Sequence, residues 1–143
     1  MKLEDCVGVA LRREDSLECR MTGARDDTEA LRESLLVSTV ALTWAPAGVP
    51  MAFAGIRDTS RDFNHQTGVV WLLTTDACRV RPLAFHRLAR RFLDACGWDV
   101  LSNHVDASYT SALRWLASLG FAVSPAAPWG PFNHPFCLVE WRR

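Results

Sequence analysis

The chain has 143 residues, of which 49% are hydrophobic and 22% are charged, and its sixteen acidic residues balance its sixteen basic ones. Disorder needs low hydrophobicity and high net charge, so this composition excludes a disordered chain. A net charge of zero argues against a general nucleic-acid binder, which needs excess basic residues to displace counterions from phosphates. At roughly 100–200 residues per domain, residues 1–143 are expected to form one domain.

Targeting signals and metal motifs are not evident in the sequence. No apolar run reaches the ~20 residues of a membrane-spanning helix, and Glu4 and Asp5 stand where a signal peptide carries an apolar core. We therefore expect no membrane span and a place in the cytoplasm. The five cysteines are scattered without a C-x-x-C pair, and the histidines lack an i, i+4 pairing, which favours reduced thiols and no metal site.

The first quarter of the chain has helical spacing. Apolar residues at helix-face intervals predict a helix over residues 5–13, and the polar stretch 14–25 can continue it until Gly23. A second helix is predicted over residues 29–36, because the Asp-Asp-Thr run that begins at Asp26 supplies N-cap candidates.

The periodicity then changes to that of β-strands. Residues 37–44 and 50–56 are predicted as strands joined by an Ala-Pro-Ala-Gly hairpin turn, and Gly55 indicates a bulge or a close backbone approach. After a polar connection, residues 68–74 are apolar in succession, which is typical of a central strand covered on both faces.

The second half alternates helices and strands. The clearest helix is predicted over residues 82–96, because Pro82 suits a first helical position and Gly97 suits a helix end. The remaining predictions are a strand over 98–105, a helix over 107–119 with Asp106 as its N-cap, and short strands over 121–123 and 136–141. This order predicts an α+β fold with a mixed sheet and not a doubly wound one.

The order of elements, with a long helix after the third strand, is similar to the GNAT (GCN5-related) N-acetyltransferase fold without its opening strand. Many GNAT proteins close their fourth helix with N-x-x-A-x-x-L-Y-x-x-x-G-F, and the run that begins at Tyr109 resembles it. Tyr109 stands in for the asparagine and Leu116 for the tyrosine. The positions that fit are Ala112, Gly120 and Phe121, with Trp115 in the apolar slot. The resemblance implies a twisted, mostly antiparallel sheet flanked by helices.

More specifically, nearly the whole chain resembles a phage-encoded branch of acetyltransferase-like proteins, found with head and internal virion proteins of short-tailed phages. The residues that carry this resemblance are Leu11-Arg12 with Asp15 and Glu18, Trp71-Leu72-Leu73 with Thr75-Asp76, Val105-Asp106-Ala107, Arg114-Trp115-Leu116, Leu119-Gly120-Phe121, and Pro131-Phe132 or Pro135-Phe136. It implies a place in the host cytoplasm or the virion. It also implies phage or host protein partners, which would pair with the sheet edge left open by the missing strand.

The GNAT resemblance implies acetyl-CoA as the acyl donor. The family holds its pyrophosphate with an R/Q-x-x-G-x-G/A loop at a helix N-terminus, and the run from Arg79 to Ala84 resembles that loop with Pro82 in place of the middle glycine. Pro82 removes one amide donor, which charge-assisted contacts from arginine can offset. The residues expected to bind the cofactor here are Arg79, Val80, Arg81 and Ala84. The alternative is that Pro82 only starts a helix and both arginines are solvated.

The resemblance also implies how the thioester is activated. In the family a strand amide at a bulge polarises the carbonyl, and the corresponding amide belongs to Leu72 or Leu73. The family's tyrosine acid falls on Leu116, which cannot donate a proton. Tyr109, the only tyrosine, lies seven residues earlier on the same helix face, about two turns away. Tyr109 is therefore the predicted acid.

A base and a different nucleophile can be read from the residues themselves. His104 and Asp106 are two apart near a strand end, so they face the same side and could form a His–carboxylate base. The alternative for Asp106 is the N-cap. Cys78 precedes the Pro82 helix, whose dipole and arginines could activate its thiol; the alternative is a buried, inert cysteine.

Three functions remain open at this point. The first is acetyl-CoA-dependent transfer to an unknown amine, the second a catalytically inactive phage structural or assembly protein, and the third an inhibitor or adaptor that acts on host machinery. An active enzyme should keep an open, V-shaped gap between the strands around Leu72 and Asn103. A scaffold should have that gap plugged, for instance by Trp71 or Tyr109.

Overall fold

The computed structural model describes residues 1–62 and 64–143. The strands are β1 (Val40–Trp44), β2 (Ala52–Asp58), β3 (Thr67–Thr74), β4 (Val100–Asp106), β5 (Ala122–Val123), β6 (Ala127–Trp129) and β7 (His134–Arg142). The helices are α1 (Arg13–Met21), α2 (Asp27–Leu36), α3 (Pro82–Ala95) and α4 (Thr110–Ser118), and the 3₁₀ turns are η1 (Leu3–Cys6), η2 (Pro46–Gly48) and η3 (Asp76–Val80).

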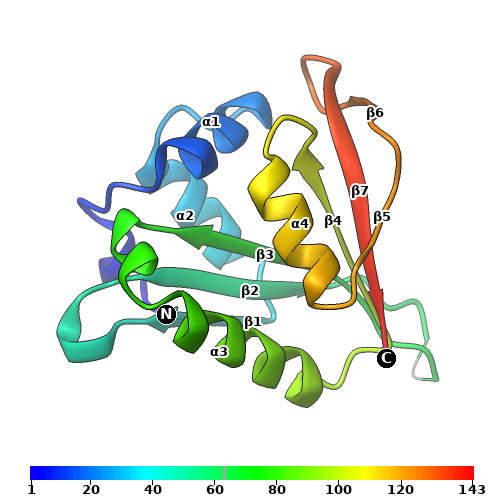
Figure 1. Ribbon diagram of the computed structural model, residues 1–143, viewed down its shortest axis with the longest axis horizontal. Helices are drawn as coiled ribbons and strands as arrows, with labels where there is room; N and C mark the ends of the chain where they lie inside the picture. Colours follow the sequence, from blue (N-terminus) through cyan, green and yellow to red (C-terminus); the bar gives the residue numbers. More distant parts are fainter. Residues whose placement is uncertain (63) are drawn as a thin grey trace.

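Every strand in the described residues belongs to one sheet, with the order β1-β2-β3-β4-β7-β5 and with β6 paired to β7 (Figure 1). The strand pairs are antiparallel except β3 with β4. Those two pair only where residues 67–69 meet residues 100–102, and beyond that point they diverge. The predicted α+β fold, with a mixed, mostly antiparallel sheet flanked by helices, is confirmed.

The helices cover the two faces of this sheet in pairs (Figure 1). On the α1/α2 face, Leu31 of α2 packs with Phe53 and Leu73, and all three are buried. On the α3/α4 face, Leu93 of α3 belongs to a second core with Leu101. Side chains alternate along each strand, so neighbouring residues contribute to different cores.

The predicted helix over residues 5–13 is wrong. The chain there forms η1, then an extended segment that passes through Gly8 at φ +71°, and α1 begins only at Arg13. The Arg12 amide donates to the Thr74 carbonyl at the end of β3, which holds the segment extended. The second helix is confirmed, with the Asp26 carboxylate accepting from the Glu29 amide at 2.8 Å.

The predicted hairpin and the predicted close backbone approach at Gly55 are also confirmed. The strands β1 and β2 pair antiparallel across η2, although β1 begins at Val40, because the preceding residues close α2 through bonds such as Val37 N–H to the Glu33 carbonyl. Gly55 is a close approach: a Cβ there would lie 2.6 Å from the Val40 carbonyl oxygen and 2.7 Å from the Trp71 ring.

In the second half, α3 begins at Pro82 as predicted, but α4 begins at Thr110, later than residue 107. Asp106 is therefore not its N-cap. The Asp106 carboxylate instead accepts from the amide and hydroxyl of Ser108, at 2.8 and 2.7 Å, and closes the turn before the helix. The short strand β6 is not predicted by its proline-rich sequence; it pairs with the start of β7 and places the Trp129 ring against Phe136.

No strand precedes α1 in the part of the chain that the structure describes, as predicted, and β1 is an edge strand. The N-terminal segment contacts that edge. The Met1 ammonium donates to the Ala41 carbonyl at 3.3 Å, and the Thr43 hydroxyl donates to the Asp5 carboxylate at 3.1 Å. Among the described helices, none is long and apolar enough to cross a membrane.

Candidate functional site

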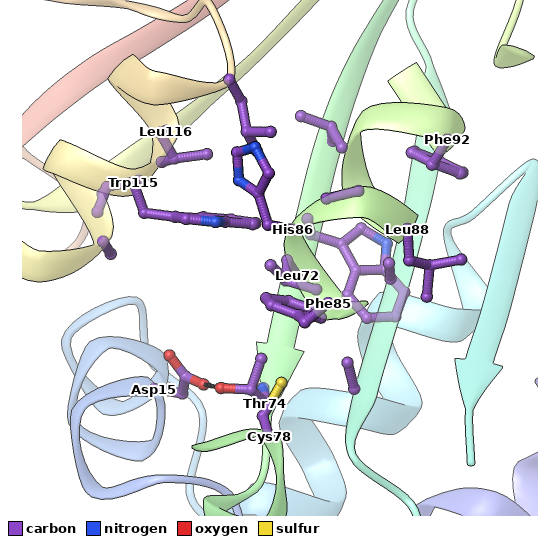
Figure 2. Close-up of a pocket in the computed structure, with 18 of the residues that line it drawn as sticks. Asp15, Leu72, Thr74, Cys78, Phe85, His86, Leu88, Phe92, Trp115 and Leu116 are labelled. Atoms are coloured by element: carbon purple, nitrogen blue, oxygen red, sulfur yellow. Dashed lines mark hydrogen bonds between the residues drawn. The ribbon is translucent and has the colours of Figure 1, made fainter. Parts of the chain in front are cut away.

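A cavity of about 670 Å³ opens where β3 and β4 diverge, between the sheet, α3 and α4. Figure 2 shows Leu72 of β3, Phe85 of α3, and Trp115 and Leu116 of α4 among the side chains that line it. The V-shaped gap expected of an enzyme is therefore present. Trp71 does not plug it, because its indole points to the α1/α2 face and donates to the Ser38 hydroxyl at 2.8 Å.

The cavity extends from the gap across the sheet beneath α3. Its floor consists of two rows of paired residues that run across β1, β2 and β3: Leu42, Ala54 and Leu72 in one row, and Trp44, Ala52 and Thr74 in the other. The ring of Phe85 stacks on Trp44 and on Trp115, with centroids 5.7 and 5.1 Å apart. This aromatic stack links α3 to β1 on one side and to α4 on the other.

The helix α1 crosses the open end of the gap. Asp15 and Glu18 are three residues apart, so they share one face of α1. The Asp15 carboxylate accepts from the amide of Thr74 at 2.8 Å and from its hydroxyl (Figure 2), and the Glu18 carboxylate accepts from the Asp106 amide at 3.0 Å. One helix face thus binds the C-terminal ends of both diverging strands.

Burial changes the acid–base behaviour of this end of the cavity. Burial, together with the charges of Asp15 and Asp106, raises the pKa of Glu18 to about 7. Burial also raises the pKa of Asp15. Burial and the negative charge of the neighbouring Asp15 raise the pKa of Tyr109. Near neutral pH, Glu18 can therefore accept or release a proton, and Tyr109 keeps its phenolic proton.

Of the predicted phosphate-binding residues between η3 and α3, only Arg79 borders the cavity. Its guanidinium lies 3.2 Å from Asp76 and 3.8 Å from Glu14. Arg81 precedes α3, whose N-terminus has no side-chain cap. The remaining members of the set, Val80 and Ala84, are exposed.

Leu72 and Leu73 face opposite sides of the sheet. The Leu72 side chain lines the cavity, whereas Leu73 is buried in the α1/α2 core. Thr74 directs its amide to Asp15 and its carbonyl to Arg12, away from β2. Because backbone groups of a strand alternate with a period of two, Leu72 directs its amide to that same side, into the gap.

The predicted acid and base lie apart. Tyr109 lines the cavity, whereas His104 stacks on Trp129, with ring centroids 4.2 Å apart, and burial lowers its pKa. The Asp106 carboxylate lies 2.9 Å from the His134 ring nitrogen, so the pairing it makes is with His134 and not with His104. Both side chains leave β4 on the face opposite Val105, which lines the cavity.

The carboxylates of α1 are the site residues that sequence reasoning missed. Asp15 and Glu18 enter only through the family resemblance, although an i, i+3 pair in the polar stretch was the available signal. Cys78 is buried, and burial raises the pKa of its thiol to about 11, which supports the inert alternative. Within the described residues, no cluster of three metal-ligating side chains occurs.

No family model and no curated protein matches the sequence. Solved structures do match the fold. The protein yncA of Salmonella typhimurium, solved with acetyl-CoA, is 16% identical over 99% of this chain and 90% of its own, with a TM-score of 0.63. A GCN5-related N-acetyltransferase from Kribbella flavida is 16% identical over 80% of this chain and 77% of its own, with a TM-score of 0.61.

A third match covers less of its partner. The chain spans 58% of an aminoglycoside N(6′)acetyltransferase from Legionella pneumophila, which is 8% identical over 67% of this chain with a TM-score of 0.55. Identities this low bear on the fold alone. The comparisons and the topology together show that this chain has a GNAT-like fold.

Proposed function

We propose that this protein binds acetyl-CoA, or a related coenzyme A thioester, in the cleft between β3 and β4 and transfers the acyl group to an amine. The observation that carries the proposal is the open gap itself: β3 and β4 pair over three residues and then leave a cavity between them. Such a gap exposes strand amides and is bordered here by two groups suited to proton transfer, Glu18 and Tyr109.

The residues around the start of α3 suit the phosphates of coenzyme A. Arg79 and Arg81 supply positive charge beside an uncapped helix N-terminus, where free amides and the helix dipole favour anions. Val80 and Ala84 would contribute backbone amides, which Pro82 cannot. The alternative is that both arginines are solvated and bind no phosphate, and the titration described below tests it.

Inside the cleft, we assign the Leu72 amide as the donor to the thioester carbonyl, since Leu72 lines the cavity. A backbone donor aimed at a developing oxyanion contributes typically ~3–4 kcal/mol to catalysis. Leu72 is favoured over Leu73, because the amide of Leu73 faces β2 by the same alternation of backbone groups. Of the two strand amides that the family resemblance implies, we therefore propose that of Leu72.

The chemistry divides between two side chains. The thioester supplies the acyl carbon, whose C–S bond breaks as its bond to the amine nitrogen forms. Glu18 takes the proton that the amine nitrogen loses. Its pKa of about 7 means that a large fraction of the Glu18 carboxyl groups is ionised at neutral pH and can accept a proton. Tyr109 holds the proton that the departing sulfur needs. His104 and Asp106 remain candidate base residues for an acceptor that enters from their face of β4.

Calorimetric titration of acetyl-CoA into the purified protein tests the proposal. We expect micromolar binding, weakened about fivefold to tenfold by Arg79→Ala or Arg81→Ala through loss of charge-assisted phosphate contacts. Arg90→Ala is the control, because Arg90 is an exposed arginine of α3 that does not line the cavity. Absence of binding at millimolar acetyl-CoA, from folded protein, would overturn the proposal.

The second candidate is an inactive scaffold, and the stack of Phe85 between Trp44 and Trp115 favours it, because these rings bridge the two helices that flank the cleft. A scaffold would bind no thioester in the same titration. The phage branch, a place in the virion and partners at the β1 edge stay predictions within this candidate. The contact of Met1 with Ala41 means that a partner strand would first have to displace the N-terminal segment.

A further inference from the structure

We propose that the part of the cavity beneath α3 is an acyl-chain pocket, and that the protein prefers linear acyl-CoA thioesters of about six to eight carbons over acetyl-CoA. This inference rests on the proposed function, since it assigns the substrate class of the same cleft. An acetyl group ends close to the Leu72 amide. The cavity instead continues past Leu72, across β2 to β1.

The floor of this pocket is hollowed by small side chains. Ala54 lies between Leu42 and Leu72 in one cross-strand row, and Ala52 lies between Trp44 and Thr74 in the next. A helix that packs on a sheet normally meets large aliphatic residues in the middle strand, because protein interiors are filled to nearly crystalline density. Alanine at both central positions leaves a trough that runs along β2 beneath α3.

The roof is unusually open for an amphipathic helix. Of the fourteen residues of α3, all of them described, only Leu93 is buried. Phe85 and Phe92 are half-buried and Leu88 is 37% exposed, although all three line the cavity (Figure 2). The apolar stripe of α3 contacts Trp44 and Trp115 through Phe85 and the core through Leu93, and the rest of it borders the cavity, where an apolar ligand would supply further contacts.

The chemistry of the walls selects the ligand. The floor contributed by β1 and β2 is apolar throughout, with Leu42, Trp44, Ala52 and Ala54. Carboxylates line the other end, where α1 crosses the gap. Among the α3 residues that line the cavity, His86 is the one polar side chain, so a sugar or a polyamine would leave most of its polar groups unpaired beneath α3, at a cost that an alkyl chain does not incur. The acyl chain therefore suits the pocket, and the amine acceptor suits the carboxylate end.

The length of the pocket sets the expected chain length. From β3 to β1 there are two strand spacings, or roughly 10 Å. An extended acyl chain of about six to eight carbons covers that distance from the carbonyl beside Leu72, whereas an acetyl group covers almost none of it. Longer chains would leave the sheet at the β1 edge, where Leu42 is exposed.

The test is a calorimetric series with acetyl-, butanoyl-, hexanoyl- and octanoyl-CoA. Burial of each methylene is worth a several-fold gain in affinity, so we expect octanoyl-CoA to bind at least about tenfold more tightly than acetyl-CoA. Ala54→Leu fills the trough and should abolish that gain without weakening acetyl-CoA binding. Ala117→Leu makes the same change on the exposed face of α4, outside the cavity, and should leave the gain intact.

The outcomes separate this inference from the proposed function. Equal affinity for all four thioesters, or a gain that survives Ala54→Leu, would overturn the acyl-chain pocket and leave thioester binding standing. Failure of every thioester to bind would overturn both. Retained acetyl-CoA binding shows that Ala54→Leu is folded. If that variant does not fold, Ala89→Leu fills the same space from the α3 side and carries the same expectation.

Discussion

The two faces of the sheet are packed differently. On the α1/α2 face, Leu31 and Phe53 are both 0% exposed and form part of a closed core. On the α3/α4 face, the core is closed near Leu93 and Leu101, but the half of α3 that contains Phe85 lies over a cavity. One sheet therefore supports a filled layer and a partly hollow one.

The difference in packing between the two faces indicates which side chains serve stability and which serve binding. Buried apolar side chains such as Leu31 contribute to folding through transfer from water and through close contacts. Side chains that border a cavity contribute less to folding, because part of their surface stays without partner atoms, and that surface remains for a ligand. We therefore expect the side chains of the α1/α2 face to contribute most to folding stability and those beneath α3 to contribute most to substrate binding.

Truncating one leucine on each helix is the strongest test of this contrast. Leu31→Ala in α2 should lower the free energy of unfolding by about 3 kcal/mol, because it leaves a cavity in a closed core. Leu88→Ala in α3 should cost under about 1 kcal/mol, since its side chain is already 37% exposed beside a cavity. Urea unfolding measures both.

Equal losses from the two leucine variants would contradict the contrast, because they would mean that α3 packs as closely as α2. The variants carry the same chemical change, so intrinsic helix propensity contributes equally to both. A thioester added at saturation should raise the stability of the Leu31→Ala variant as it does that of the wild type, because Leu31 lies on the other face.

Adding methyl groups to neighbouring residues of β2 probes the same contrast in the opposite direction. Gly55→Ala should destabilise by about 2 kcal/mol, because its Cβ would overlap the Val40 carbonyl and the Trp71 ring on the closed face. Ala54→Val adds two methyls over the trough and should cost under about 1 kcal/mol. Thermal unfolding measures the loss of stability in each variant. A larger loss for Ala54→Val than for Gly55→Ala would show that the trough is filled by side chains.

Glu18 belongs to α1 but lines the cavity on the other face of the sheet, and the pH dependence of stability tests its protonation state. The pKa of Glu18 is about 7 in the folded protein, against an ordinary value of 4.5. Between those values the folded chain keeps a proton that the unfolded chain has lost, so stability falls as pH rises through that window. Glu18→Gln should therefore be more stable than the wild type by up to about 3 kcal/mol at pH 8.

That difference should shrink as pH falls and vanish near pH 4.5, where Glu18 is protonated in the folded state. Comparing the two proteins in urea at each pH cancels the contribution of Asp15, whose raised pKa acts in the same direction. A difference that is constant across pH would mean that Glu18 is ionised in the folded protein at all these values. The same variant should lose transfer activity while keeping thioester affinity, if Glu18 is the base.

Local sequence rules predicted the elements whose signals are short-range. Pro82 at the start of α3, the Asp26 cap of α2 and the turn after β1 each depend on a few neighbouring residues, and each is confirmed. The helix over residues 5–13 failed because a tertiary bond, from the Arg12 amide to Thr74, holds that segment extended. Tertiary contacts override weak propensity, and Gly8 made the propensity weak.

The site was less predictable for the same reason. The gap between β3 and β4 is visible in the sequence only through the family resemblance, since no local pattern shows where two distant strands stop pairing. The perturbed pKa of Glu18 depends on burial beneath strands far along the chain. The trough likewise needs the register that places Ala52 and Ala54 between larger residues.

The smallest effect in this series concerns the helix N-termini of the two faces. Asp26 caps α2 through a 2.8 Å bond to the Glu29 amide, so Asp26→Ala should cost about 1 kcal/mol of stability. No side chain caps α3, so Arg81→Ala should change stability by under about 0.5 kcal/mol. When acetyl-CoA affinity is measured, Arg81→Ala should have the larger effect, because Arg81 precedes the α3 N-terminus proposed to bind phosphate. A stability loss at Arg81 equal to that at Asp26 would mean that Arg81 serves the fold, and the α3 terminus would then not be held open for phosphate.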